Sequence, residues 1–149
     1  MENKTVDLLN KLVEINNDRI EGYETASKET DDSDLKSLFS QLAQTSHGCN
    51  AELTAEVQQL GGTPVEGTRV SGKFYRAWMD VRAAISGKDR KAILKSCEYG
   101  EDVAVKTYEE ILEEHPQDLT DMHLAMVEDQ YQMIKADHDR VKELRDTLV

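Results

Sequence analysis

The sequence has few of the residues on which all-β domains and disulfide frameworks depend. Aromatic residues make up 5% of the 149 residues, and there are only two prolines and two cysteines. Charged residues, by contrast, make up 32%. This combination is typical of a helical protein with solvated faces rather than of an all-β domain. A chain of this length is expected to form one domain, spanning residues 1–149.

Basic residues are in deficit. There are 18 lysines and arginines against 30 aspartates and glutamates, which gives a net charge of −12. Binding to a nucleic acid needs lysine and arginine concentrated on one face, and an acidic chain is repelled by an anionic membrane surface. The expected partners therefore include neither nucleic acid nor membrane.

Long apolar segments are also missing. No run of about 18 apolar residues occurs, and the first five residues, Met-Glu-Asn-Lys-Thr, resemble no part of a signal peptide. Cys49 and Cys97 fall on apolar helix faces, where a free thiol usually behaves as a small hydrophobic side chain. Two such cysteines without a secretion signal fit a reducing compartment, so a cytoplasmic location is expected.

Helical periodicity is the main pattern that the sequence does contain. Apolar residues recur at intervals of three and four in four long segments, which predicts four amphipathic helices. These segments cover residues 5–28, 34–60, about 90–115 and 119–148. Gly61 and Pro64 end the second segment and Pro116 ends the third, because glycine favours a helix C-terminus and proline cannot continue a helix.

A shorter amphipathic helix is predicted between the second and third long ones. Its apolar residues are Phe74, Trp78, Val81 and Ile85. The second long helix should be roughly 40 Å long, and a simple antiparallel turn would need only a handful of residues. A loop, a short helix and a second turn are enough to return along the bundle. The predicted fold is therefore all-α, a ferritin-like four-helix bundle with a long crossover containing a short extra helix.

Four short segments of the chain form a recognisable set. They are Leu-Lys-Ser-Leu-Phe at residues 35–39, Leu-Gly-Gly-Thr-Pro at 60–64, Ala-Ile-Leu-Lys-Ser-Cys-Glu-Tyr-Gly-Glu-Asp at 92–102 and His-Asp-Arg-Val at 138–141. Together they resemble an uncharacterised bacterial family that is placed in the ferritin-like superfamily as a domain of unknown function. The resemblance covers nearly the whole chain. It implies a ferritin-like bundle and a bacterial cytoplasmic protein, and it implies no activity.

Di-metal bundles follow a defined ligand pattern. One Glu comes from each of two helices, and a Glu-x-x-His motif comes from each of the other two. In this chain the residue three positions before His47 is Gln44, and the residue three positions before His138 is Lys135. Both motif helices therefore lack the carboxylate–imidazole pair, and we predict no complete di-metal site and no resident cofactor. Should iron or another divalent metal bind, its candidate ligands are Glu21, His47, Glu98, Glu101, Glu128 and His138.

His138 is the most informative of these candidates. The spacing of the apolar residues around it places it on the core-facing side of the last helix. A metal there would be repelled by Lys135. We therefore expect a buried, metal-free imidazole that is hydrogen-bonded to Glu98, Glu101 or Tyr23. Such an imidazole would titrate near neutrality.

Residues for covalent catalysis are not evident, so no catalytic residue is assigned. Ser46 and His47 are adjacent, and adjacent helical residues diverge by about 100°, which disfavours a nucleophile–base pair. No glycine-rich phosphate cradle follows a strand, because no strand is predicted. His123, in the first turn of the last helix, is expected at the surface.

Two classes of function remain. The first is a non-enzymatic helical bundle that acts through protein contacts, with a protein partner or a second copy of the chain, in stress physiology. Its interaction residues would be Phe74, Trp78, Val81 and Ile85, which either dock on their own bundle or form a homodimer seam. The alternative is a divergent ferritin-like metalloprotein, a metal-binding protein or an oxidoreductase, with an atypical set of Glu and His ligands.

Overall fold

Helices make up nearly all of the described chain. The computed structural model describes residues 2–66, 83 and 90–147, and these contain no strand. The long helices are α1 (Glu2–Glu29), α2 (Ser33–Gln59), α4 (Arg90–Glu114) and α5 (Asp121–Thr147), and a short 3-10 helix is η1 (Pro116–Asp118). The prediction of four long helices is confirmed. The predicted interaction residues Phe74, Trp78, Val81 and Ile85 lie outside the described residues.

Local sequence explains where α2 begins and ends. The carboxylate of Asp32 accepts hydrogen bonds from two backbone N–H groups of the first turn, which have no partner within the helix. At the other end Gly61 has a φ of 85°. The N–H groups of Gly61 and Gly62 donate to carbonyl oxygens of the last turn, which is the Schellman arrangement. The Gly-Gly pair therefore ends the helix, as the sequence predicts.

Replacing Gly61 with alanine should lower the free energy of unfolding by about 1–2 kcal/mol, because a positive φ is strained for a residue with a Cβ. Gly48 is the matched control, since it lies inside α2 and a Cβ there meets nothing within 4 Å. Gly48→Ala should raise the free energy of unfolding by about 0.5–1 kcal/mol. Equilibrium urea unfolding of both variants checks the contrast, and a change of the same sign in both would contradict it.

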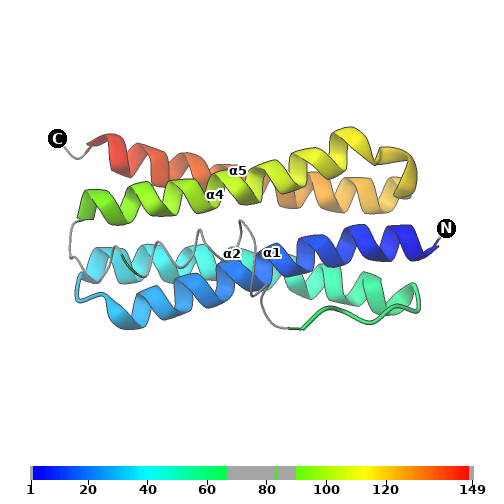
Figure 1. The fold of residues 1–149 in the computed structure, drawn as a ribbon, viewed down its shortest axis with the longest axis horizontal. Helices are drawn as coiled ribbons and strands as arrows, with labels where there is room; N and C mark the ends of the chain where they lie inside the picture. The colour runs from blue at the N-terminus through cyan, green and yellow to red at the C-terminus, as the bar shows by residue number, and fades with distance from the viewer. Residues whose placement is uncertain (1, 67–82, 84–89, 148–149) are drawn as a thin grey trace.

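The end of α2 and the start of α4 lie at opposite ends of the bundle (Figure 1). Helices α1 and α2 pack as one antiparallel pair, and α4 and α5 pack as a second (Figure 1). An ion pair of 3.2 Å between Arg90 and Asp32 joins the start of α4 to the start of α2, so these two helices run in the same direction. At the opposite end, Thr5 of α1 donates a hydrogen bond to the backbone carbonyl of Asp118. These helix directions agree with the predicted crossover topology, whereas most of the connecting residues lie outside the described part of the chain.

The core is mostly apolar, and the predicted stripes on α2 and α4 are buried. They consist of Leu35, Leu38, Phe39, Leu42, Cys49, Leu53 and Val57 on α2 and Ile93, Cys97, Gly100, Ala104, Tyr108 and Ile111 on α4. Polar and charged side chains are nevertheless buried among them. Asn16, Arg19, Ser46, Glu101 and Gln130 are each 0% exposed. A buried charge is costly unless it is paired, so these residues are where a site would be sought.

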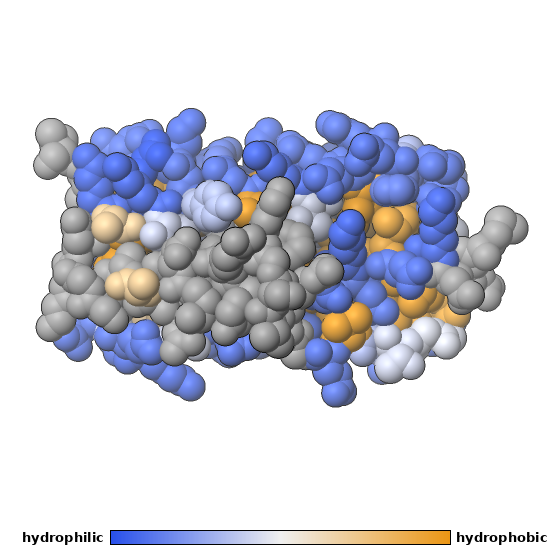
Figure 2. Space-filling view, viewed as in Figure 1, coloured by the Kyte–Doolittle hydropathy of each residue, from blue (hydrophilic) through white to orange (hydrophobic). Residues whose placement is uncertain are grey.

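The outer surface is largely hydrophilic. On the face shown in Figure 2, hydrophilic side chains line the long edges of the bundle and hydrophobic side chains show between the helices. No helix in the described part of the chain has both the length and the apolar character needed to cross a membrane.

Candidate functional site

A buried arginine in the core contacts the other three long helices. Nε and Nη2 of Arg19, on α1, donate to the two carboxylate oxygens of Glu101 on α4, at 2.8 and 2.7 Å. Nη1 donates to Oγ of Ser46 on α2 at 2.6 Å. Nη2 also donates to Oδ2 of Asp137 on α5 at 3.1 Å. These four residues, one from each long helix, form the arginine layer.

The charges of the arginine layer depend on one another. Burial by itself lowers the pKa of Arg19, but the negative charges of Glu101 and Asp137 raise it above its ordinary value. Burial raises the pKa of Glu101, and the contact with Arg19 opposes that rise. The side chains of Arg19 and Glu101 are 0% exposed, whereas that of Asp137 is 18% exposed and reaches water. The guanidinium thus holds a buried carboxylate that water cannot stabilise.

An aromatic pair covers the guanidinium. The Cζ atom of Arg19 lies 5.6 Å from the ring centroid of Tyr23, within range of a cation–π interaction. The Tyr23 ring stacks in turn on Phe39, with centroids 5.8 Å apart and an interplanar angle of 18°. Burial raises the pKa of Tyr23 well above its ordinary value, so its phenol stays neutral. The pair shields one side of the arginine layer.

A second set of buried polar side chains links the same four helices. Asn16 Nδ2 donates to Oη of Tyr108 at 2.9 Å, and Tyr108 Oη donates to Oε1 of Gln130 at 2.8 Å. The amide nitrogen of Gln130 donates to the carbonyl oxygen of Cys49 at 3.3 Å and to Glu52 Oε1 at 3.0 Å. Asn16, Tyr108 and Gln130 form the amide layer. Neutral groups bonded to one another in this way fix how the helices pack and leave little for substrate chemistry.

The two thiols are poor nucleophiles. Cys49 and Cys97 are free and buried, and both pack in the apolar core. Burial raises the pKa of Cys49 to about 11 and also raises that of Cys97. The thiolate is the reactive form of cysteine, so both residues act as small hydrophobic side chains, as the sequence indicates.

Two of the predicted ligand candidates lie on the inner side of α4. Glu101 is fully buried, and both of its oxygens are bound by Arg19. Glu98 lies one turn earlier and is paired with Arg145 of α5. Each carboxylate therefore has its own arginine, and the two do not share a site.

The other glutamate candidates and His47 lie at the surface. His47 Nε2 lies 3.0 Å from Oε2 of Glu24, and both side chains are 52% exposed. Glu21 and Glu128 are exposed on α1 and α5. Among residues 2–66 and 90–147, no group of three or more His, Cys, Asp or Glu side chains is placed to hold a metal ion.

His138 lies at the edge of the core, so the expectation of full burial is wrong. Its side chain is 18% exposed. Nε2 lies 2.5 Å from Oδ1 of Asp102, and Nδ1 lies 3.1 Å from Oδ1 of Asp139. The imidazole does contact a carboxylate of α4, but the partner is Asp102 and not Glu98 or Glu101.

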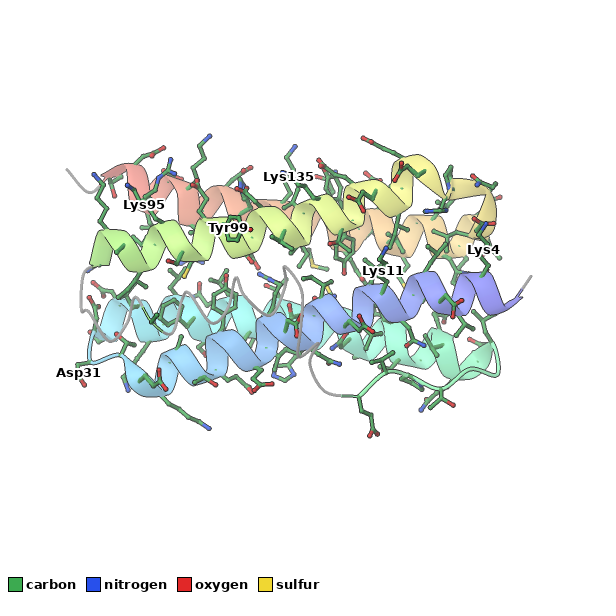
Figure 3. The ribbon with its side chains drawn as sticks, viewed as in Figure 1. Lys4, Lys11, Asp31, Lys95, Tyr99 and Lys135 are labelled. Carbon is green, nitrogen blue, oxygen red and sulfur yellow. The ribbon has the colours of Figure 1, made fainter. Side chains whose placement is uncertain are left out.

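The register of α5 explains this difference. Ile134 is fully buried, and Gln130 and Asp137 lie on the same side of the helix, where they reach the two polar layers. His138 is one position further around the helix. Lys135 is exposed and points away from the bundle (Figure 3). The position three residues before His138 is therefore not aimed at the core, and the expected ligand geometry does not apply to this turn.

Replacing His138 with leucine should remove part of the pH dependence of stability. Burial lowers the pKa of His138, but hydrogen bonds with Asp139 and Asp102 outweigh it and raise the pKa above its ordinary value. The protonated imidazole therefore stabilises the fold at low pH, and this contribution is lost as the pH rises from about 6.5 through the folded-state pKa. His138→Leu should fold, because Asp102 is 48% exposed and can be hydrated. Urea unfolding between pH 6 and 9 measures the effect, and identical pH profiles for the two proteins would refute it.

His123 is buried, contrary to the expectation of a surface residue. It is 3% exposed. Its Nε2 lies 2.9 Å from Oε1 of Glu56 on α2, and its Nδ1 lies 2.9 Å from Oγ1 of Thr120. The first turn of α5 packs against the last turns of α2, so this imidazole is covered although its neighbours Asp121 and Met122 are exposed.

Sequence reasoning did not select Arg19 or Asp137 as site residues, because charged side chains are seldom buried. A signal was nevertheless present. Arg19 lies three residues after Asn16 and four before Tyr23, so it shares their face of α1. A polar residue on a core-facing stripe implies a partner on another helix, and that partner is Glu101.

The arginine layer does not fit a metal centre. A di-metal centre in a helical bundle needs four carboxylates and two imidazoles around a pair of metal ions. The layer supplies the two carboxylates of Glu101 and Asp137 and the hydroxyl of Ser46, and it contains no imidazole. The guanidinium of Arg19 lies among these oxygens and carries a permanent positive charge, which opposes a second cation.

A protein-family model matches most of the chain. The family model described as "Domain of unknown function (DUF2383)" matches residues 4–114. The matched region includes Arg19, Ser46 and Glu101, whereas Asp137 lies beyond it. The expected resemblance to an uncharacterised domain family is therefore confirmed. No curated protein matches the chain.

Proposed function

We propose that this chain, which belongs to the DUF2383 family, is a non-enzymatic, ferritin-like bundle of the bacterial cytoplasm that acts through protein contacts. The ferritin-like assignment is supported by the crossover, since α2 and α4 run in the same direction and an antiparallel partner follows α1 and α4.

One observation carries the non-enzymatic part of the proposal. Arg19 binds Glu101 through two hydrogen bonds and binds Asp137 through a third. An active site needs acids, bases or ligands that can exchange an internal partner for a substrate. Here the buried carboxylate of Glu101 would have to leave the guanidinium of Arg19 to do so, and its own charge would then be buried without compensation. The layer is therefore suited to holding four helices together.

Metal analysis distinguishes this proposal from the metalloprotein alternative. Protein should be purified without an affinity tag, analysed for bound metals, and assayed for oxygen-dependent oxidation of Fe²⁺. We expect substoichiometric metal, no oxidation above the buffer rate, and a melting temperature unchanged by a chelator. A stoichiometric metal whose removal lowers the melting temperature would establish the alternative.

The surface offers an open groove beside an exposed aromatic residue. Tyr99 of α4 is 50% exposed. A groove of about 300 Å³ lies beside it between α1 and α4, and its lining includes Lys11, Val103 and Lys106; Figure 3 shows Tyr99 and Lys11. Exposed aromatic rings such as that of Tyr99 are enriched at protein interfaces, which have a polar rim around them. This groove supports action through surface contacts.

The proposed partner is a second copy of the chain. This part of the proposal rests on the sequence, which predicts an apolar helix face within residues 74–85. Sedimentation equilibrium of the wild-type chain and of Trp78→Asp tests it. We expect a dimer that Trp78→Asp converts into a folded monomer. A monomer at every concentration, with a lower melting temperature in Trp78→Asp, would instead show that this segment docks on its own bundle.

A further inference from the structure

We infer that the arginine layer is a cation site whose cation is the side chain of Arg19. The guanidinium takes the position that a bound divalent cation would take between the helices. Glu101, Asp137 and Ser46 act as its ligands. This inference concerns the core and is independent of the surface contacts proposed above.

The arrangement of oxygens around Arg19 is the first argument. Four oxygens from three helices converge on its nitrogens: Oγ of Ser46, Oε1 and Oε2 of Glu101, and Oδ2 of Asp137, at distances of 2.6–3.1 Å. Oxygens of Glu101 and Asp137 meet at the same nitrogen, Nη2. In helical bundles, metal ions are bound in the same way, by carboxylates from different helices that share one cation.

The charge of the layer is the second argument. Glu101 and Asp137 contribute two negative charges against one positive charge of Arg19. Both carboxylates point to the same place, and without a cation between them they would repel each other in a site of low dielectric constant. Removing the guanidinium therefore leaves a space lined by oxygens with two negative charges. Such a site favours a hard divalent ion such as Mn²⁺, because carboxylate and hydroxyl oxygens are its preferred ligands.

The position of the site is the third argument. The Arg19 and Glu101 side chains are fully buried, but that of Asp137 is 18% exposed. A small hydrated ion thus has a route to the layer beside Asp137, and it can keep water molecules where the protein supplies too few ligands. The built-in cation makes the bundle independent of metal supply, since the charge that joins α1 to α4 and α5 is covalently part of the chain.

Rescue of an Arg19 variant by Mn²⁺ alone tests the inference. Arg19→Ala should melt well below the wild-type chain in the presence of a chelator, and MnCl₂ in excess should raise its melting temperature by about 5 °C or more. A wild-type shift of less than about 1 °C is expected, because its cation is already in place. Electron paramagnetic resonance should show Mn²⁺ immobilised by Arg19→Ala and free in the presence of the wild-type chain.

Two further variants make the result decisive. Arg19→Ala combined with Glu101→Gln keeps the space but removes one charge, so Mn²⁺ should no longer raise its melting temperature. Arg19→Glu adds a carboxylate from α1 and should bind Mn²⁺ more tightly than Arg19→Ala. The inference is overturned if Mn²⁺ rescues neither Arg19→Ala nor Arg19→Glu, if neither variant folds with Mn²⁺ present, or if the combined variant is rescued equally. These three outcomes concern the variants and count against the cation site. Metal bound by the wild-type chain would instead count against the proposed function.

Discussion

Replacing Arg19 with methionine should lower the free energy of unfolding by about 3–5 kcal/mol at pH 7.5, the range observed when one partner of a buried ion pair is removed. Methionine retains much of the aliphatic length of arginine, so the loss reports the charge more than a cavity. Glu101 would remain fully buried without the two hydrogen bonds that it now accepts. The Glu101 carboxylate would also face the negative charge of Asp137 without a cation between them.

The loss caused by Arg19→Met should depend on pH in a defined direction. Burial already raises the pKa of Glu101, and Arg19 opposes that rise. Without Arg19 the folded-state pKa of Glu101 rises further above the unfolded value. A raised carboxyl pKa means that the folded state is favoured at low pH and loses this advantage as the pH rises through the folded-state pKa. The variant should therefore come closer to the stability of the wild-type chain at pH 5 than at pH 7.5.

Equilibrium urea unfolding at the two pH values measures both effects. Arg90→Met is the matched control, because Arg90 also pairs with an aspartate but its side chain is 40% exposed. An exposed ion pair contributes about 0–1 kcal/mol, so the control should change little. A loss below about 1 kcal/mol in Arg19→Met, equal to that of the control, would show that the arginine layer does not hold the bundle together.

The fold could be predicted from sequence because its determinants are local or repetitive. Asp32 and the Gly61–Gly62 pair mark the ends of α2 by satisfying or terminating backbone hydrogen bonds, and such signals act over a few residues. The apolar stripes repeat over several turns, so one wrongly assigned position does not change the predicted helix. The crossover followed from the length of the linker alone. These features required no knowledge of which side chains meet.

The arginine layer could not be predicted in the same way, because its meaning depends on contacts between distant residues. Arg19 and Glu101 are 82 positions apart, and the helix face that each occupies does not say which partner it meets. The same reason explains the error at His138. The expected stripe on α5 includes His138, but Asp137 is the residue of this turn that reaches the arginine layer. Only the pairing of Asp137 with Arg19 shows which side faces the core.

Replacing Glu101 with leucine should also lower the free energy of unfolding by about 3–5 kcal/mol, but without recovery at any pH from 5 to 9. Leucine is similar in size to glutamate, so the core stays filled. Arg19 would keep Asp137 and Ser46 as partners and lose the two shortest contacts to a carboxylate. An arginine cannot release its proton in this range, so the buried cation cannot become neutral as the buried Glu101 carboxylate can in Arg19→Met.

Recovery at low pH in Arg19→Met but not in Glu101→Leu would identify the buried charge, and not the packing, as the source of both losses. In the combined variant Arg19→Met and Glu101→Leu, the buried pair is replaced by apolar side chains of similar size, a change that is often neutral or stabilising. Only Asp137 keeps its charge, and it reaches water. The combined variant should therefore be more stable than either single variant. Because each single loss is about 3–5 kcal/mol, the interaction energy in the double-mutant cycle should exceed about 3 kcal/mol. Urea unfolding of the three variants measures it, and additive losses would mean that Arg19 and Glu101 stabilise the bundle separately.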